Sequence, residues 1–448
     1  MAAHSVSQIP APLAPSQLER RWQQEFRQRW QAVATGQWRC IGIDVGKYEH
    51  VAVAYDGLGQ LLARPLRFGI RAADYQALFA WVATVVPDPV VTPLFGLEPT
   101  GHYYEQLVYE LAQQYGPKQV YIVQTTDVAR RRADWNQGTF KNDEVDAAII
   151  SELLRQGHGR PYHPDEGAYL SLYQLERYRW AREQASTRLK NQIVGHVDRL
   201  YPGLVISDKA SAERYQPLFC NLWANDTPRR LLLLYPEPRD LRSTDVETLC
   251  QRFRTADYWM TRPYAAKILA AVRALPLPDA ELAARRSTFL QQDLASLAYV
   301  EGQLAEVATE MVDLLDLTWG LWLRPTGVEP LRLACLVATI GDMRQYHSAR
   351  QLFGRSGLHS GCHDSGTRQQ RGQGERMVKP GDRHLRRQLL RFTLSMVAHY
   401  PTLQTYRNQL LQRGKRKITA NIAVARKLCG LLYALASQER PFDPTRLA

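Results

Sequence analysis

The sequence predicts an α/β domain near its start, a long helical middle region and a small, basic all-α domain at its end. Short apolar runs alternate with amphipathic stretches up to about residue 165, as in α/β domains. Beyond that point, apolar residues recur at helical spacing over stretches too long for strands. The 448 residues are 45% hydrophobic and 23% charged, which excludes wholesale disorder. We place the domain boundaries at 1–38 (an N-terminal extension), 39–165, 166–324 and 325–448.

Three meandering strands are expected first, after a polar helix over 16–34. They cover 40–44, 51–55 and 61–68, and Asp56-Gly57 is a hairpin signal between the second and third. Alternating helices and strands follow, at 72–86, 93–97, 103–115, 119–123 and 143–154. This β-β-β-α-β-α-β-α order is that of the ribonuclease-H-like fold.

Long helices are predicted over 169–200 and 280–317, where Leu290, Leu294 and Leu297 share one face. These helices either pack within the chain or form a coiled coil with a second copy. The Pro-rich stretch 201–276 between them is expected to be irregular. The last domain has predicted helices at 331–340, 348–356, 383–400 and 408–436. Its Gly- and Arg-rich loop covers 357–382, and loops of that length usually carry function or are disordered.

The positive charge is confined to the end of the chain. Residues 331–448 contain 21 basic and 6 acidic residues, a net +15, whereas the whole chain is at +13, so the rest sums to −2. Such a basic region indicates a polyanionic partner, nucleic acid before anionic membrane. Most of these cations are Arg, whose planar fork suits phosphate oxygens and guanine edges.

Cysteine usage and hydropathy favour the cytoplasm. The six cysteines are scattered without a CxxC pair, which indicates reduced thiols. The sequence shows no apolar signal core near its start and no run of 18 apolar residues, so we expect no membrane partner.

Four carboxylates occur where an α/β fold brings side chains together. Asp44 and Glu98 each end an apolar strand, and Asp143 and Asp146 share one face of a predicted helix. Gathered at a sheet edge, they would suit two Mg²⁺ ions about 3.5–4 Å apart, an arrangement that serves phosphoryl transfer. Lys141 is placed to contact a phosphate. Taken singly, each acid also fits a strand-end turn or a solvated helix face.

The basic loop contains a candidate nucleophile, Ser365. Surrounding cations would stabilise an alkoxide-like oxygen and the pentavalent phosphorus that it attacks, although Ser-Gly is also an ordinary turn dipeptide. The candidate nucleic-acid-binding residues of this region are all cationic: Arg368, Arg371, Arg376, Lys379, Arg383, Arg386 and Arg387.

Four motifs appear in order along the chain. They are Cys40-Ile-Gly-Ile-Asp44-Val-Gly-Lys47, Glu98-Pro-Thr-Gly101-His-Tyr103, Lys141-Asn-Asp143-Glu-Val-Asp146-Ala147, and Ser365-Gly366 with Lys379-Pro-Gly381-Asp382-Arg-His-Leu385-Arg386. Together they resemble the DEDD-type insertion-sequence transposases, the IS-one-ten group. The resemblance covers roughly residues 38–165 and 325–435.

That resemblance implies a RuvC-like catalytic domain joined to a helical transposase domain, in an enzyme that cuts and rejoins DNA. It implies that Asp44, Glu98, Asp143 and Asp146 bind Mg²⁺, and that Ser365 becomes covalently linked to DNA. It further implies guidance by a bridge RNA and a homo-oligomer, a dimer or tetramer, in which the acidic domain of one subunit and the serine of another form composite sites.

Other functions stay open on sequence grounds. A metal-dependent, structure-selective nuclease, similar to a Holliday-junction resolvase, would use the acidic site with water as the nucleophile. A non-catalytic nucleic-acid-binding protein would use the carboxylates as caps and surface charge. Asp44-Val-Gly46 also resembles the phosphate turn of actin-like kinases, but the sequence lacks the second Gly-rich turn and the adenosine motif that these need.

Overall fold

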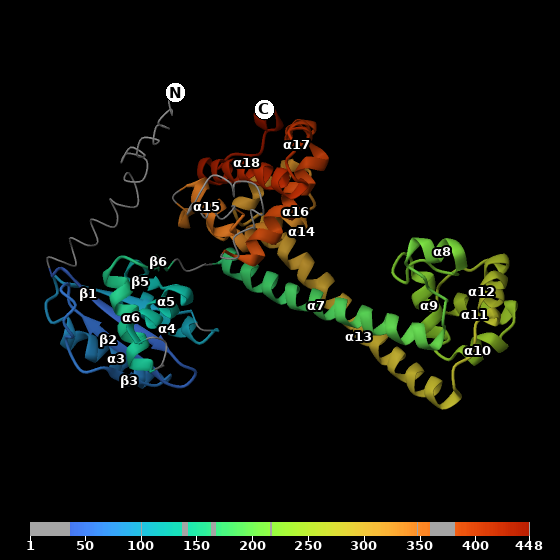
Figure 1. The fold of residues 1–448 in the computed structure, drawn as a ribbon, viewed down its shortest axis with the longest axis horizontal. Helices are drawn as coiled ribbons and strands as arrows, with labels where there is room; N and C mark the ends of the chain where they lie inside the picture. The colour runs from blue at the N-terminus through green and yellow to red at the C-terminus, as the bar shows by residue number, and fades with distance from the viewer. Residues whose placement is uncertain are drawn as a thin grey trace, which may run out of the picture. The chain divides into compact units, whose positions relative to one another are not determined.

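The computed structural model describes residues 36–99, 101–136, 142–162, 167–215, 217–346, 348–358 and 381–447. The chain divides into two compact units between Pro164 and Asp165 (Figure 1), and each unit is described by itself. The helix predicted over 16–34 lies outside the described residues.

The first unit is a mixed α/β domain built on a six-stranded sheet of order β3-β2-β1-β4-β5-β6. The strands are β1 (Trp38–Val45), β2 (His50–Tyr55), β3 (Leu66–Phe68), β4 (Thr92–Leu97), β5 (Val120–Ile122) and β6 (Arg160–Pro161). Strands β1 to β3 are antiparallel, β1, β4 and β5 are parallel, and β6 runs antiparallel to β5. The predicted order of strands is confirmed, with β6 as an addition.

Helices cover both faces of this sheet. They are α3 (Ala72–Val85), α4 (Tyr104–Tyr115), α5 (Thr125–Asn136) and α6 (Asp143–Arg155). Ile41 and Ile43 of β1 pack with Leu78 of α3 and Leu107 of α4 in one core cluster. Since side chains alternate along a strand, the intervening residues of β1 face α6 instead. Helix α5 was not predicted, and it carries a residue of the candidate site.

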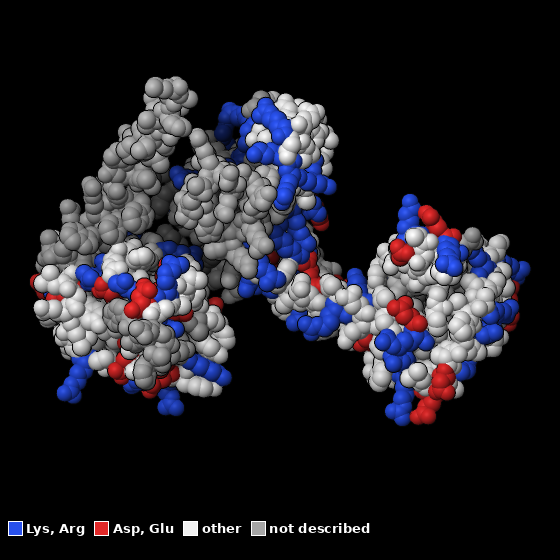
Figure 2. All heavy atoms as spheres, in the orientation of Figure 1, with Lys and Arg blue, Asp and Glu red and all other residues white. Residues whose placement is uncertain are grey.

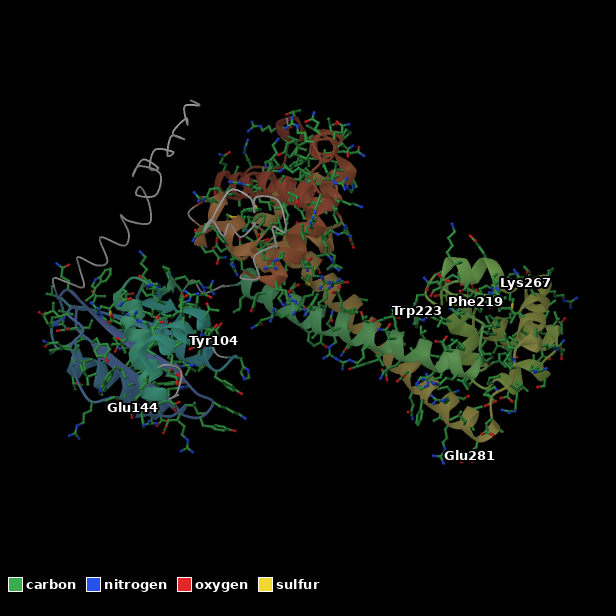
Figure 3. The ribbon with its side chains drawn as sticks, in the orientation of Figure 1. Tyr104, Glu144, Phe219, Trp223, Lys267 and Glu281 are labelled. Atoms are coloured by element: carbon green, nitrogen blue, oxygen red, sulfur yellow. The ribbon has the colours of Figure 1, made fainter. Side chains whose placement is uncertain are left out.

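In the second unit, two long helices run side by side, α7 (Ala168–Leu200) and α13 (Ala280–Leu315) (Figure 1). Both were predicted, and they pack against each other within the chain. At one end of the pair lies a small helical module, and its buried side chains include Phe219, labelled in Figure 3. The module comprises α8 (Lys209–Tyr215), α9 (Asp226–Leu234), α10 (Pro238–Ser243), α11 (Val246–Thr255) and α12 (Arg262–Ala274).

The expectation that 201–276 is irregular was therefore wrong. Its prolines suggested breaks, but Pro238 and Pro263 occupy the first turns of α10 and α12. A first-turn proline costs no hydrogen bond, because the N–H that it lacks has no partner within the helix. The helices are then held by a core that includes Tyr201, Tyr235 and Phe253, each almost fully buried.

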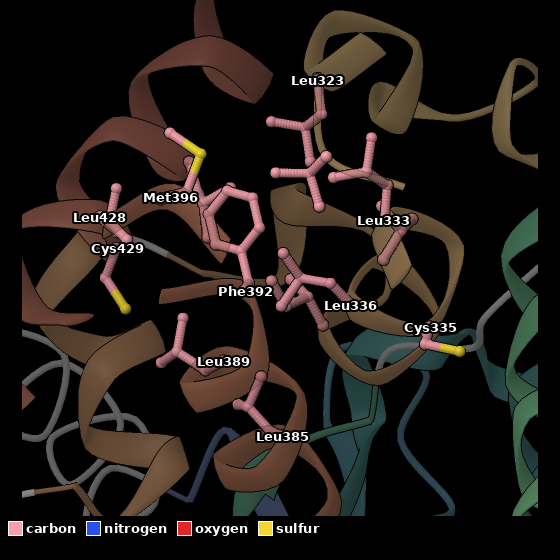
Figure 4. Close-up of a cluster of buried hydrophobic side chains, with 14 of the residues drawn as sticks. Leu323, Leu333, Cys335, Leu336, Leu385, Leu389, Phe392, Met396, Leu428 and Cys429 are labelled. Carbon is pink, nitrogen blue, oxygen red and sulfur yellow. The ribbon is translucent and has the colours of Figure 1, made fainter. Parts of the chain in front are cut away.

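The other end of the long pair packs into the C-terminal helical core (Figure 4), where Leu336, Phe392 and Leu428 are buried. Its elements are the 3₁₀ helix η2 (Trp319–Thr326) and α14 (Pro330–Ile340), α15 (Ala349–Ser356), α16 (Arg383–His399), α17 (Pro401–Gln412) and α18 (Lys417–Gln438). The single helix predicted over 408–436 was wrong. Gly414, at φ +76°, ends α17 and lets α18 start in a new direction.

Helix α18 is long and apolar enough to span a membrane, judged by length and composition among the described residues. However, its Val424, Leu428 and Leu432 are buried in the C-terminal core with residues of α14 and α16. A core helix passes the same test, so the helix does not indicate a membrane partner.

Candidate active site

Two of the four predicted carboxylates end adjacent parallel strands. Ile43 of β1 pairs with Leu97 of β4, so the next residues, Asp44 and Glu98, stand beside each other at the carboxyl ends of these strands. Ile43 and Leu97 point into the core under α3 and α4. By the alternation of side chains, Asp44 and Glu98 are therefore directed to the opposite face of the sheet, which α6 covers.

Helix α6 lies unusually close to this face because β1 and β4 present glycines to it. A Cβ on Gly42 would be 2.1 Å from the Ala147 carbonyl oxygen, and one on Gly96 would be 3.1 Å from the Ile150 side chain. Ser151 Oγ donates to the Cys40 carbonyl oxygen at 2.7 Å. Strand β1, followed from Cys40 to Asp44, therefore runs along α6 from Ser151 back toward the first turn of that helix.

That first turn carries Asp143 and Asp146, so the fold brings all four acidic positions to one end of one sheet face. Asn142 caps the helix, and its side chain accepts a hydrogen bond from the Glu144 N–H at 3.1 Å. The positive end of the helix dipole favours carboxylates in this turn. Asp143 is exposed, Asp44 and Glu98 are half-buried, and Asp146 is only 1% exposed.

Asp146 is held by an arginine from α5. Arg132 Nε lies 2.5 Å from Asp146 Oδ1, and this ion pair is largely shielded from solvent. Carboxylate oxygens are the donors that Mg²⁺ prefers, so the residues suit that ion in kind and in position. Within the described residues, however, no three His, Cys, Asp or Glu side chains converge closely enough to hold a metal ion.

A second arginine holds the first turn of α6 from the sheet side. Arg67 of β3 contacts Glu144 and Glu49, each at 3.0 Å. Glu144 is labelled in Figure 3. These ion pairs are exposed, so each adds little to stability.

The predicted nucleophile Ser365 lies outside the described residues, as do Lys141, Arg368, Arg371, Arg376 and Lys379. The two ends of its loop are described, and they meet. The Asp382 N–H donates to the Arg355 carbonyl oxygen at 2.7 Å, and a Cβ on Gly381 would be 2.7 Å from Gly357 Cα. Gly381 has φ +125°, which favours glycine. The serine loop therefore leaves and re-enters the domain at one narrow neck.

The three predicted nucleic-acid-binding arginines of the neck differ in their surroundings. Arg383 is exposed. Arg386 Nε donates to the Ser356 carbonyl oxygen at 3.0 Å, on the other side of the neck. Arg387 pairs with Glu183 of α7 at 2.8 Å and lies 3.8 Å above the Trp180 ring. Arg386 and Arg387 thus hold the neck to the rest of the domain.

Sequence reasoning missed Arg132 because it missed α5. The signals were present: Thr125 and Asp127 are typical of a helix start, and three arginines in a row follow at 130–132. A basic helix before an acidic first turn indicates an ion pair between the two.

Comparison with known proteins assigns the family. Residues 41–202 match a transposase family, and residues 323–408 match the transposase IS116/IS110/IS902 family. A pilin gene-inverting protein of Moraxella lacunata is 31% identical over 118 residues, 26% of this chain and 36% of that protein. A probable family 20 transposase of Pseudomonas aeruginosa is 28% identical over 173 residues, 38% of this chain and 49% of that protein.

The chain thus spans between about a third and a half of the length of these relatives. An uncharacterized 42 kDa protein of insertion element IS900 from Mycobacterium paratuberculosis is 25% identical over 410 residues, 90% of this chain and 96% of that protein. The first match includes the acidic site and the second includes the serine loop with its neck, and on these matches the chain belongs to the IS116/IS110/IS902 family of transposases.

Proposed function

We propose that this protein is a DNA transposase and recombinase that cuts and rejoins DNA through a covalent link to Ser365, assisted by a divalent metal at the acidic site. One observation carries the proposal. The β1–β4 register and the glycine contacts of α6 bring Asp44, Glu98 and the turn with Asp143 and Asp146 to one end of one sheet face. This is the position that phosphoryl transfer on a RuvC-like, ribonuclease-H-like domain requires.

The residues of this site would hold Mg²⁺ through carboxylate oxygens. When bound, the ion would make an attacking hydroxyl more acidic and stabilise the negative charge on a leaving oxygen. When no metal ion is bound, Arg132 neutralises the negative charge of Asp146. Asp44 and Glu98 would contribute from the ends of β1 and β4, and Asp143 and Asp146 from the first turn of α6.

In the proposed reaction, the Ser365 oxygen forms a bond to a DNA phosphorus and loses its proton. The bond from phosphorus to the 3′ oxygen breaks, and the released 3′-hydroxyl takes up a proton. The serine phosphodiester conserves the energy of the broken bond, so a different 3′-hydroxyl can reverse the attack and rejoin strands without ATP. The cations of the loop would stabilise the charge on the transferred phosphoryl group.

The DNA partner is inferred from the charge, whereas the guide RNA and the oligomer are inferred from the family resemblance. Lys and Arg gather over α16 and α17 (Figure 2), a surface suited to DNA phosphates. We assign donor and target DNA to this region and a bridge RNA as the guide. A dimer or tetramer would allow the acidic site of one subunit to meet the serine loop of another. A protein that acts on DNA with an RNA guide would work in the cytoplasm, and we propose that location.

Recombination assays with purified variants test the proposal. Ser365→Ala should abolish recombination and covalent adducts but leave DNA binding intact, because the hydroxyl is not needed for charge attraction. Asp44→Asn should abolish recombination and the formation of covalent adducts, and it should lower the affinity for Mg²⁺. Products that carry free 5′-phosphates and no attached protein would instead support a nuclease that uses water. Unchanged recombination by both variants would contradict the catalytic roles proposed for Ser365 and Asp44.

A further inference from the structure

The C-terminal helical core contains a cavity of about 610 Å³ that the acidic site and the serine loop do not explain. Its volume lies within the range of about 300–1,000 Å³ that is typical of small-ligand sites. Five aromatic side chains from four segments line it: Tyr169 of α7, Trp319 and Trp322 of η2, Tyr346 and Tyr433 of α18. The cavity lies entirely within the second unit.

Two of the five rings are held in place by hydrogen bonds at their polar edges. Trp319 Nε1 donates to the Gly341 carbonyl oxygen at 2.9 Å, and Tyr346 Oη donates to the Ile340 carbonyl oxygen at 3.0 Å. Trp322 and Tyr433 are half-buried and so remain accessible from solvent. Trp319 and Tyr346 are only 6% and 5% exposed, so an incoming flat ring would stack on the more accessible Trp322 and Tyr433. Aromatic side chains packed against a fixed core lose little entropy when such a ring enters.

Charged groups stand at the rim. The Arg344 side chain is 89% exposed and lies 2.5 Å from Asp342, which balances that carboxylate. Glu439 is exposed and lines the cavity from the end of α18. A carboxylate accepts hydrogen bonds from ring N–H and amino groups, whereas an exposed arginine attracts phosphate.

The backbone at Glu439 gives independent support. Glu439 has φ +46°, in the left-handed region, at the position after α18 where glycine is usual. A glutamate there costs conformational free energy that glycine would avoid. Strained backbone is typical of functional sites, which agrees with a binding role for the Glu439 carboxylate.

We propose that this cavity binds one unpaired base of the nucleic acid on which the protein acts, stacked on the aromatic side chains and hydrogen-bonded by Glu439. The inference rests on the proposed function. A simple cation is disfavoured because Arg344 already neutralises Asp342 and because residues 331–448 carry a net +15. A base inside a duplex cannot reach such walls, so the occupant is an unpaired or extruded base, as strand exchange produces.

The test uses two DNA duplexes of the same sequence, one fully paired and one with a single unpaired 2-aminopurine, a base whose fluorescence falls on stacking. Wild-type protein should quench the unpaired 2-aminopurine and bind its duplex more tightly. Tyr433→Ala should lower that affinity about 5-fold or more and relieve the quenching, with no change for the paired duplex. Glu439→Gln, at an exposed position that does not support the core, should also weaken binding of the unpaired base.

Trp259→Ala is the matched control, because Trp259 is 73% exposed and does not line the cavity. Equal affinities and no quenching with wild-type protein would overturn the cavity assignment while leaving the recombinase proposal intact. Failure of the wild-type protein to bind either duplex would overturn both. A change in self-association of Tyr433→Ala without any effect on DNA would show that a second copy occupies the cavity, which also contradicts the assignment.

Discussion

Replacing Gly42 by alanine tests whether the contact between β1 and α6 positions the acidic site. The new Cβ would lie 2.1 Å from the Ala147 carbonyl oxygen and 2.3 Å from the Ser151 nitrogen. Both are backbone atoms, so no rotamer change relieves the clash. Restoring van der Waals contact requires α6 to move by about 1 Å or more. We expect a loss of about 1–3 kcal/mol in the free energy of unfolding, the usual range for overpacking.

The same shift carries Asp143 and Asp146 away from Asp44 and Glu98. A displacement near 1 Å can lower a rate about 100-fold, so recombination should fall further than stability alone explains. Urea unfolding and a recombination assay measure the two effects. The control is Gly302→Ala in α13, where a Cβ meets no atom within 4 Å. It should stabilise by about 0.5–1 kcal/mol, as Gly→Ala does in helices. A Gly42→Ala protein as stable and active as wild type would refute this reasoning.

Three further predictions concern the ion pair, the neck and a buried acid. Arg132→Ala leaves the buried Asp146 carboxylate without its ion-pair partner, so the thermal midpoint of unfolding should fall in metal-free buffer. Adding Mg²⁺ should restore part of that loss. An equal loss with and without Mg²⁺ would contradict a role for Asp146 in metal binding. Gly381→Ala, at φ +125° and against Gly357, should reduce covalent adducts more than DNA binding, measured on the same preparation. Burial raises the pKa of Glu176 in the folded protein. The protonated form therefore contributes stability that is complete below the pKa of the unfolded state and is lost as the pH rises through the higher pKa of the folded state. Glu176→Gln should therefore stabilise at pH 7.5 and not at pH 4 in urea unfolding, and a gain of equal size at both would argue against this effect.

Strand and helix periodicity predicted most elements of the first unit because its apolar runs are short, bounded and distinct. The helices of the small helical module, α8 to α12, were not predicted, for a local reason. Prolines were taken as breaks, yet Pro238 and Pro263 stand in helix first turns, where the missing N–H has no cost. Tertiary contacts of Tyr201 and Tyr235 then hold helices too short to be stable alone.

The same contrast applies to the candidate site. Asp44 and Glu98 were predictable because parallel strands end together, and the spacing of Asp143 and Asp146 marks one helix face. The Arg132–Asp146 pair was not, because it depends on how α5 packs against α6 in three dimensions. Likewise, the closed neck at Gly357 and Gly381 depends on contacts between residues 24 apart, which no local pattern reports.

The central claim is that Ser365 carries the DNA strand during recombination. Mass spectrometry of the denatured protein, after incubation with Mg²⁺ and substrate DNA and digestion of both, tests this most directly. We expect a nucleotide 5′-phosphate attached to the peptide that contains Ser365, and none on that peptide from the Asp44→Asn protein. An attached nucleotide on another residue, or recombined DNA without any adduct, would contradict it.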